Sequence, residues 1–302
     1  MSSLRRAISG HTRVAGVVGD PVRHSLSPTL HNAAFAASGL DWAYVAFPVA
    51  TGLARPALMA MRVLGIDGLS VTMPHKTEML AGCDSASDDS VKLGSINTIV
   101  RNSDGSLHGE STDGPGFIDA LAAAGVDPVG LDCLVLGAGG AGRAVILALA
   151  RAGARRIVVV NRSAERAAQA AALAPNIAVV GSADAGDSCS LIVNATPQGM
   201  GDSSELPIDS CRLGPGQIVN DLVYHPLETP LLRAAAATGA RPLGGLGMLL
   251  HQAGRQFTLW TGQAAPIEAM GAAVREVLAA GVERGERPAS PEPGAKAPRT
   301  GS

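Results

Sequence analysis

The stretch LVLGAGGAGRAVILALA, residues 134–150, constrains the fold more than any other part of the chain. It places the pattern G-x-G-x-x-G at Gly137, Gly139 and Gly142, after an apolar strand-like run and at the start of an Ala/Leu-rich helix. The first glycine permits a tight turn, the second lets a pyrophosphate approach the main chain, and the third lets the helix pack on the strand. The free N–H groups at the helix start favour a phosphate. We therefore expect a dinucleotide-binding α/β domain, with a purely structural glycine turn as the alternative.

The end of the next strand indicates which dinucleotide is bound. The strand-like run Arg156–Val160 is followed by NRSAER, with Asn161, Arg162, Ser163 and Arg166. A site for NAD usually has Asp or Glu here, which accepts a hydrogen bond from the ribose 2′-OH. Two guanidinium groups and a hydroxyl suit a 2′-phosphate instead. The pattern predicts NADP, and the alternative is a solvated basic helix start.

Composition excludes several classes of function. The 302 residues, 46% hydrophobic and 17% charged, are enough for two domains with substantial cores. A net charge of −2 and 3% aromatic residues give no basis for nucleic-acid binding. The chain has no run of 18 apolar residues and no apolar segment near its start, so we expect neither a membrane span nor a secretory signal. Its four cysteines form no C-x-x-C pair and its histidines no ligand pair, so we expect no metal site and a cytoplasmic protein.

The rest of the chain alternates strand-like and helix-like segments. Up to about residue 110 this alternation predicts a parallel α/β layer, in which Ser27 caps a helix over Pro28–Ser38 and residues 102–105 form a hairpin turn. Residues 247–280 are predominantly helical in pattern. The tail, residues 281–302, is rich in Pro, Gly and charged residues, and we expect it to be disordered.

Two features of the first half suggest a catalytic site. Lys76, in SVTMPHKTE, is one of only three lysines in a chain with 21 arginines. A lysine ammonium can be tuned to give up its proton, whereas an arginine stays protonated. Ser25 and Ser27 flank Leu26, so in an extended segment both hydroxyls project to one side, where they suit a carboxylate. The alternative is that Ser27 only caps the following helix.

Eight motifs in order connect these features: GDPxxHSxSPxxHN, VTxPHK, GSINT, STDG, GAGGAGRA, NRS, NATPQGM and GGLGMLLHQA. Together they resemble the shikimate dehydrogenase family over residues 14–280. The resemblance implies two α/β domains: an N-terminal substrate domain, residues 1–113, completed by C-terminal helices 247–280 that return to it, and a Rossmann-type NADP-binding domain, residues 114–246. It also implies NADPH-dependent reversible reduction of 3-dehydroshikimate to shikimate, in aromatic amino acid (chorismate) biosynthesis.

The resemblance also implies roles for individual residues. Lys76 and Asp113 match the catalytic lysine and its carboxylate partner. The residues that match substrate contacts are Ser25, Ser27, Thr72, Asn97, Asp113, Tyr224 and Gln252. Those that match cofactor contacts are Gly137, Gly139, Gly140, Gly142, Asn161, Arg162, Ser163, Arg166, Ala195, Leu222 and Gly245. The chemistry requires a hydride and a proton for the developing alkoxide, and a lysine ammonium can supply that proton and stabilise the charge. Whether Lys76 or Asp113 transfers it is left open.

Two positions depart from the usual family pattern, since Ser70 and Ser111 stand where Asn is more common. Quinate and aminoshikimate dehydrogenases share the scaffold and are the nearest alternatives. A methylenetetrahydrofolate dehydrogenase fits less well because a pteridine would require more aromatic or apolar surface. An NADP-binding sensor without activity fits less well because Lys76 and Asp113 are both retained. The expected partners are a small-molecule substrate and, at most, a second copy of the chain, as a monomer or homodimer.

Overall fold

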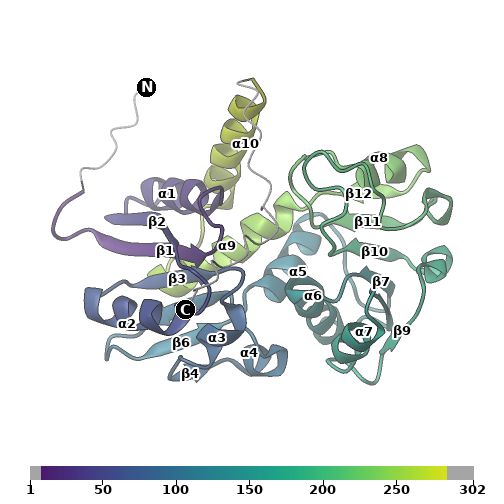
Figure 1. The fold of residues 1–302 in the computed structure, drawn as a ribbon. Helices are drawn as coiled ribbons and strands as arrows, with labels where there is room; N and C mark the ends of the chain where they lie inside the picture. The colour runs from purple at the N-terminus through teal and green to yellow at the C-terminus, as the bar shows by residue number, and fades with distance from the viewer. Residues whose placement is uncertain (1–7, 284–302) are drawn as a thin grey trace, which may run out of the picture.

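The computed structural model describes residues 8–283, which form two six-stranded sheets flanked by helices (Figure 1). The first sheet has the order β2-β1-β3-β5-β6-β4 and the second has the order β12-β11-β10-β7-β8-β9. The strands of the first sheet are β1 (Arg13–Gly19), β2 (Trp42–Pro48), β3 (Gly68–Val71), β4 (Ser85–Ala86), β5 (Thr98–Arg101) and β6 (Leu107–Glu110). The strands of the second are β7 (Asp132–Leu136), β8 (Arg156–Val160), β9 (Ala178–Val180), β10 (Leu191–Asn194), β11 (Ile218–Asp221) and β12 (Arg241–Leu243).

The first sheet is mixed. Strands β2, β1 and β3 pair in parallel, as the alternating pattern predicts, but β5 runs antiparallel to both β3 and β6. The expectation of a parallel layer is therefore wrong for this part, because the hairpin turn at residues 102–105 joins β5 directly to β6. Its helices are α1 (Ser27–Ala37), α2 (Ala54–Leu64), α3 (Lys76–Leu80) and α4 (Asp88–Leu93).

A second correction concerns the start of α1. Ser27 is the first residue of this helix, and the cap position is Leu26, which makes no side-chain cap hydrogen bond. The Ser27 hydroxyl therefore does not cap the helix. It is available for other contacts, which favours the predicted role in carboxylate binding.

The second sheet is parallel throughout. Its flanking helices are α5 (Asp113–Ala123), α6 (Gly140–Arg151), α7 (Ala164–Ala171) and α8 (Pro230–Ala237), with short 3-10 turns η1 (Ala183–Ser188) and η2 (Ser210–Arg212). Helix α5 packs very closely on its neighbours because its first turn holds two glycines. A Cβ on Gly114 would lie 2.8 Å from the carbonyl oxygen of Ala144 in α6, and one on Gly116 would lie 2.5 Å from the amide nitrogen of Gln252.

Two C-terminal helices, α9 (Leu246–Thr261) and α10 (Ile267–Glu283), follow the second sheet but pack on the first (Figure 1). Phe257, Trp260 and Met270 lie in one buried cluster with Leu30 and Phe35 of α1. The Trp260 Nε1–H donates to the main-chain oxygen of Ile99, at 3.1 Å. Helix α9 thus crosses from one sheet to the other and lies beside α5. Residues 284–302 of the predicted disordered tail lie outside the described residues.

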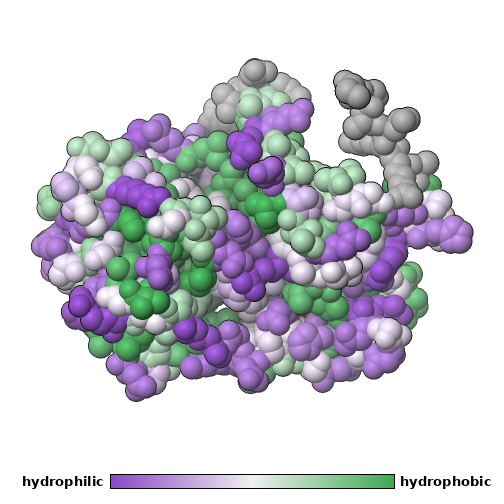
Figure 2. All heavy atoms as spheres, turned by 180° about the vertical axis from the view of Figure 1, so that it is seen from behind, coloured by the Kyte–Doolittle hydropathy of each residue, from purple (hydrophilic) through white to green (hydrophobic). Residues whose placement is uncertain are grey.

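None of the helices within residues 8–283 is long and apolar enough to cross a bilayer. Hydrophilic and hydrophobic residues are interspersed over the face shown in Figure 2.

Candidate functional site

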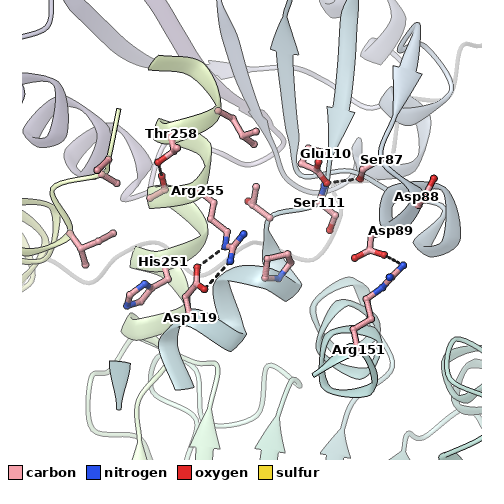
Figure 3. A pocket seen from close by; sticks show the side chains of 17 residues that line it. Ser87, Asp88, Asp89, Glu110, Ser111, Asp119, Arg151, His251, Arg255 and Thr258 are labelled. Carbon is pink, nitrogen blue, oxygen red and sulfur yellow. Dashed lines mark hydrogen bonds and ion pairs between the residues drawn. The ribbon is translucent and has the colours of Figure 1, made fainter. Parts of the chain in front are cut away.

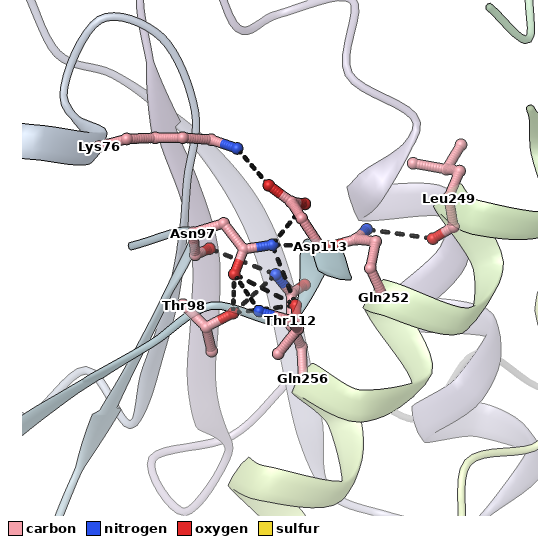
Figure 4. A network of polar contacts seen from close by, with 8 residues as sticks. All are labelled: Lys76, Asn97, Thr98, Thr112, Asp113, Leu249, Gln252 and Gln256. Atoms are coloured by element: carbon pink, nitrogen blue, oxygen red, sulfur yellow. Dashed lines mark hydrogen bonds and ion pairs between the residues drawn. The ribbon is translucent and has the colours of Figure 1, made fainter. Parts of the chain in front are cut away.

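The centre of the candidate site is an ion pair between Lys76 and Asp113. Lys76 begins α3, just after the loop that follows β3, and Asp113 begins α5, just after β6. The Lys76 Nζ lies 2.6 Å from Asp113 Oδ2, and the side chains are 25% and 15% exposed (Figure 4). The structure therefore brings together the two residues that the motifs identified, in a place that a small molecule can reach.

Asn97 holds the other oxygen of the same carboxylate. Its Nδ2 donates to Asp113 Oδ1 at 2.7 Å, while its Oδ1 accepts from the main-chain N–H of Thr112 at 2.8 Å (Figure 4). The Thr112 contact fixes the orientation of the amide, because a main-chain nitrogen can only donate. Gln252 of α9 lies beside this group, with its Oε1 at 3.4 Å from Asn97 Nδ2. Both Asp113 oxygens thus have a donor, Lys76 for one and Asn97 for the other.

The residues of the first half that are predicted to contact substrate lie at the same edge of the first sheet. Thr72 follows β3, and its N–H donates to the main-chain oxygen of Val18 at the end of β1. Ser25 and Ser27 lie in the segment after β1, with their hydroxyl oxygens 3.1 Å apart. Since β5 is antiparallel, Asn97, which precedes it, lies at this edge as well. The carboxyl ends of parallel strands are where ligands bind in open α/β sheets.

Tyr224 follows β11 in the second half of the chain. Burial raises the pKa of its hydroxyl above the usual value, and this hydroxyl makes no hydrogen bond to another residue of the described range. Its predicted contact with substrate stays a prediction.

The glycine loop has the geometry that a pyrophosphate requires. Gly137 has a φ of +108°, a conformation that side chains rarely adopt, and a Cβ on Gly142 would lie 2.1 Å from the carbonyl oxygen of Gly137. A Cβ on Gly139 or Gly140, in contrast, would meet no protein atom within 4 Å. Helix α6 begins at Gly140 without a side-chain cap, so its first N–H groups face open space. This loop therefore fits a dinucleotide phosphate.

The residues after β8 fit a further anion. Asn161 ties this segment to the glycine loop, since its Oδ1 accepts from the Ala138 N–H at 3.2 Å. Ser163 caps α7, and its Oγ accepts from the Arg166 N–H at 3.3 Å. The side chains of Arg162 and Arg166 are exposed, and neither forms an ion pair within residues 8–283. Two unpaired guanidinium groups beside a helix start are consistent with the predicted 2′-phosphate site.

The other predicted cofactor residues lie together at the carboxyl edge of the second sheet. Ala195 and Leu222 follow β10 and β11, and the Leu222 N–H donates to the main-chain oxygen of Asn194. Gly245 rests on this segment, because a Cβ there would lie 2.3 Å from the Leu222 carbonyl oxygen. Only glycine fits at this position.

Two arginines of α6 connect the halves of the molecule. The Arg143 guanidinium donates to the main-chain oxygen of Leu93, at the end of α4, at 2.7 Å. Arg151 forms an ion pair with Asp89 of α4. The helix that begins at the glycine loop is therefore attached to the half that carries Lys76. The pattern GAGGAGRA contains Arg143, but nothing in it indicates a partner 50 residues away.

A separate cavity of about 800 Å³ lies between α4, α5, α6 and α9 (Figure 3). It includes Pro115 and Asp119 of α5, which lie on a different face of the helix from Asp113. In its wall Arg255 pairs with Asp119 through two contacts of 2.6 and 2.8 Å. Neither Lys76 nor Asp113 lines this cavity, so it is distinct from the candidate site.

Sequence reasoning missed a second layer of polar residues behind the site. Tyr44 and Gln256 are both 2% exposed, and hydrogen bonds connect both to Ser70. The spacing of Gln252 and Gln256, one helical turn apart, was the available signal, because it places both amides on one face of α9.

Comparisons with known proteins support the assignment of these motifs. Family models match residues 17–99 ("Shikimate dehydrogenase substrate binding domain"), 122–182 ("Shikimate / quinate 5-dehydrogenase") and 245–275 ("Shikimate 5'-dehydrogenase C-terminal domain"). The chain is 44% identical over 286 residues to the shikimate dehydrogenase (NADP(+)) of Moorella thermoacetica, which covers 90% of this chain and 96% of the relative.

Solved structures agree with this similarity. A shikimate dehydrogenase in complex with NADP+ superposes with a TM-score of 0.85 at 36% identity, over 91% of this chain and 99% of the other. The shikimate 5-dehydrogenase of Thermus thermophilus, in complex with NADP(H) and shikimate, gives a TM-score of 0.82 at 36% identity, over 88% and 99%. The predicted fold class, two α/β units with C-terminal helices that return to the first, is confirmed.

Proposed function

The chain belongs to the shikimate dehydrogenase family, and from this premise we propose that it catalyses the NADPH-dependent, reversible reduction of 3-dehydroshikimate to shikimate. The reaction is a step of aromatic amino acid (chorismate) biosynthesis. The observation that carries the proposal is the 2.6 Å ion pair of Lys76 and Asp113 at the carboxyl edge of the first sheet.

Each residue of this pair has a distinct task. When bound, NADPH supplies the hydride. The Lys76 ammonium stabilises the negative charge that develops on the substrate oxygen and holds a proton near it. Asp113 keeps that ammonium in place, and Asn97 in turn keeps the carboxylate in place through its 2.7 Å hydrogen bond. A lysine serves here because it can give up a proton, which an arginine cannot.

We assign the other predicted residues by the same reasoning. Ser25 and Ser27 would bind the substrate carboxylate, and Thr72, Asn97 and Gln252 the ring hydroxyls. Tyr224 is a further substrate contact. The glycine loop would hold the pyrophosphate with main-chain N–H groups, and Arg162 and Arg166 the 2′-phosphate. Ala195, Leu222 and Gly245 would line the nicotinamide pocket.

We further propose that residues 1–113 with 247–280 form the substrate domain and residues 114–246 the NADP domain. The packing of α9 and α10 on the first sheet supports this division. We propose a cytoplasmic enzyme that acts as a monomer or homodimer.

The test measures NADPH oxidation with 3-dehydroshikimate, and the reverse reaction with shikimate and with quinate, each with NADP and NAD. We expect turnover of shikimate with NADP. In Lys76→Ala we expect kcat to fall by about 10²–10⁴-fold, the usual range for losing a general acid or base, and NADP affinity to remain unchanged. Lys76→Arg should be impaired as well, since it cannot release a proton.

Lys92→Ala is the matched control, because Lys92 is an exposed lysine at the end of α4 and should leave kcat unchanged. Turnover of quinate with NAD, and none of shikimate with NADP, would contradict the proposal in favour of a quinate dehydrogenase, which one of the matching family models also covers.

A further inference from the structure

A buried hydrogen-bonded chain leads from Tyr44 through Ser70 to Asn97, and Gln256 of α9 determines its direction. The Gln256 Nε2 donates to the main-chain oxygen of Asn97 at 3.3 Å and to Thr98 Oγ1 at 3.0 Å (Figure 4). A main-chain oxygen can only accept, so the amide cannot be reversed. Its Oε1 therefore faces Ser70 Oγ at 2.8 Å and His31 Nε2 at 3.2 Å, and both must donate to it.

This direction passes on to Tyr44. Because the Ser70 hydroxyl donates to Gln256, its oxygen accepts from the Tyr44 hydroxyl at 2.6 Å. The Tyr44 hydroxyl is therefore the donor in its hydrogen bond to Ser70. Ser70 thus links Tyr44 to Gln256.

The other end of the chain reaches the ion pair. The Thr98 hydroxyl, which accepts from Gln256, donates to Asn97 Oδ1 at 2.9 Å. Asn97 then donates to Asp113. Each donor from Tyr44 onwards therefore points toward the Asp113 carboxylate, and the chain ends at Asn97, one of the proposed substrate contacts.

The central members of this chain are deeply buried. Tyr44 and Gln256 are 2% exposed and Ser70 is 6% exposed. The ring of His31 stacks on that of Tyr44 with a centroid distance of 4.4 Å and an angle of 17°, so one face of the tyrosine ring is covered. Satisfied buried polar networks rigidify what they connect, and the loss of one member leaves its partners unpaired.

We propose that Ser70 is a positioning residue for substrate binding: together with Tyr44 it fixes the Gln256 amide, which holds Thr98 and, through it, the Asn97 side chain. The inference rests on the proposed function, in which Asn97 binds a ring hydroxyl of the substrate. It gives a role to a position at which the sequence departs from the usual family pattern. Neither Ser70 nor Tyr44 is proposed to touch the substrate.

The test compares KM and kcat of Ser70→Ala and Tyr44→Phe with wild type, using whichever of shikimate and quinate the wild type oxidises. The loss of one neutral hydrogen bond predicts that KM for that substrate rises roughly two- to tenfold in each variant. We expect kcat to change less than about twofold, because Lys76 and Asp113 keep their partners, and KM for NADP to stay constant.

A double variant separates positioning from general destabilisation. If both residues act through one link, KM in Ser70→Ala/Tyr44→Phe should rise by the larger of the two single-variant factors and not by the product of those factors. Ser70→Thr, which keeps the hydroxyl, should restore KM. Ser90→Ala is the matched control, since Ser90 is also buried and hydrogen-bonded, to Ser87 of the adjoining loop, and should change only the thermal midpoint.

In an active enzyme, three outcomes would each overturn the inference. KM for the substrate could stay unchanged in both single variants, or the two effects could multiply in the double variant. KM for NADP could also rise as much as KM for the substrate. A wild type that oxidises neither substrate would instead refute the proposed function, and with it this inference.

Discussion

His31 should make the first half of the molecule sensitive to acid. Its ring is fully buried between Tyr44 and Trp260, and burial lowers its pKa to about 3, despite the opposing hydrogen bond to Gln256. Its Nδ1 also has no hydrogen-bond partner among the described residues, so a proton added there would stay unpaired. The folded state therefore keeps this histidine neutral at pH values at which an unfolded chain protonates it.

The sign and size of the effect follow from linkage. The folded pKa lies below the unfolded value of 6.5, so the stabilisation is complete above pH 6.5 and is lost as the pH falls from 6.5 toward 3. When the pH falls from 8 to 5, His31 of the unfolded chain becomes protonated below pH 6.5, whereas His31 of the folded protein stays neutral. Protonation therefore stabilises the unfolded state over about 1.5 pH units. This corresponds to about 2 kcal/mol of unfolding free energy, at about 1.36 kcal/mol per unit.

The assay is urea unfolding followed by tryptophan fluorescence at pH 8, 6.5 and 5. Both tryptophans of the chain, Trp42 and Trp260, pack in the hydrophobic cluster around α1, so the signal reports on the region that contains His31. His31→Phe is the comparison, because it keeps an aromatic ring against Tyr44 and removes the titrating group.

Carboxylates and the other histidines titrate alike in both proteins, so their contributions cancel in the comparison. We expect the wild type to lose about 2 kcal/mol more than His31→Phe between pH 8 and pH 5. Equal losses in the two proteins, or a smaller loss in wild type, would refute the reasoning.

Three further predictions concern other parts of the structure. Gly245→Ala should lower the unfolding free energy, measured in urea melts, by about 1–3 kcal/mol, because its Cβ would meet a carbonyl oxygen at 2.3 Å. Gly244→Ala is the control: a Cβ there would have no atom nearer than 3.8 Å, so its unfolding free energy should lie within about 0.5 kcal/mol of the wild-type value. Replacing Arg162 and Arg166 together by Ala should raise KM for NADP at least about tenfold and leave KM for NAD unchanged in steady-state assays. Arg151→Ala should change the unfolding free energy by less than about 1 kcal/mol, since its side chain is 54% exposed; a larger loss would show that this ion pair matters more than exposed pairs do.

Local sequence signals predicted the parts of the fold that depend on local structure. The glycine loop, β7 and β8 lie where the sequence indicated, because turn, strand and helix there are each specified by residues within one short segment. The ion pair of Lys76 and Asp113 came from the family resemblance. No periodicity relates two residues 37 positions apart, and it took the fold to show that they meet.

The features that were missed depend on distant contacts. The Ser70–Gln256 hydrogen bond joins residues 186 positions apart, and no local pattern connects them. Ser27 looked like a helix cap because Pro28 follows it, yet the helix begins one residue earlier, and the Ser27 hydroxyl lies 3.1 Å from that of Ser25 instead. The antiparallel direction of β5 follows from the strand beside which it pairs, and the alternating pattern does not specify that strand.

The attachment of α6 to α4 has a consequence for how the two ligands would influence each other. Arg143 lies three residues after the start of the helix that follows the glycine loop, and it donates to the last carbonyl of α4 in the other half. Under the proposed function, a nucleotide that moved α6 would therefore also move α4. Any such coupling would be reciprocal: nucleotide and substrate would change each other's affinity by one and the same factor.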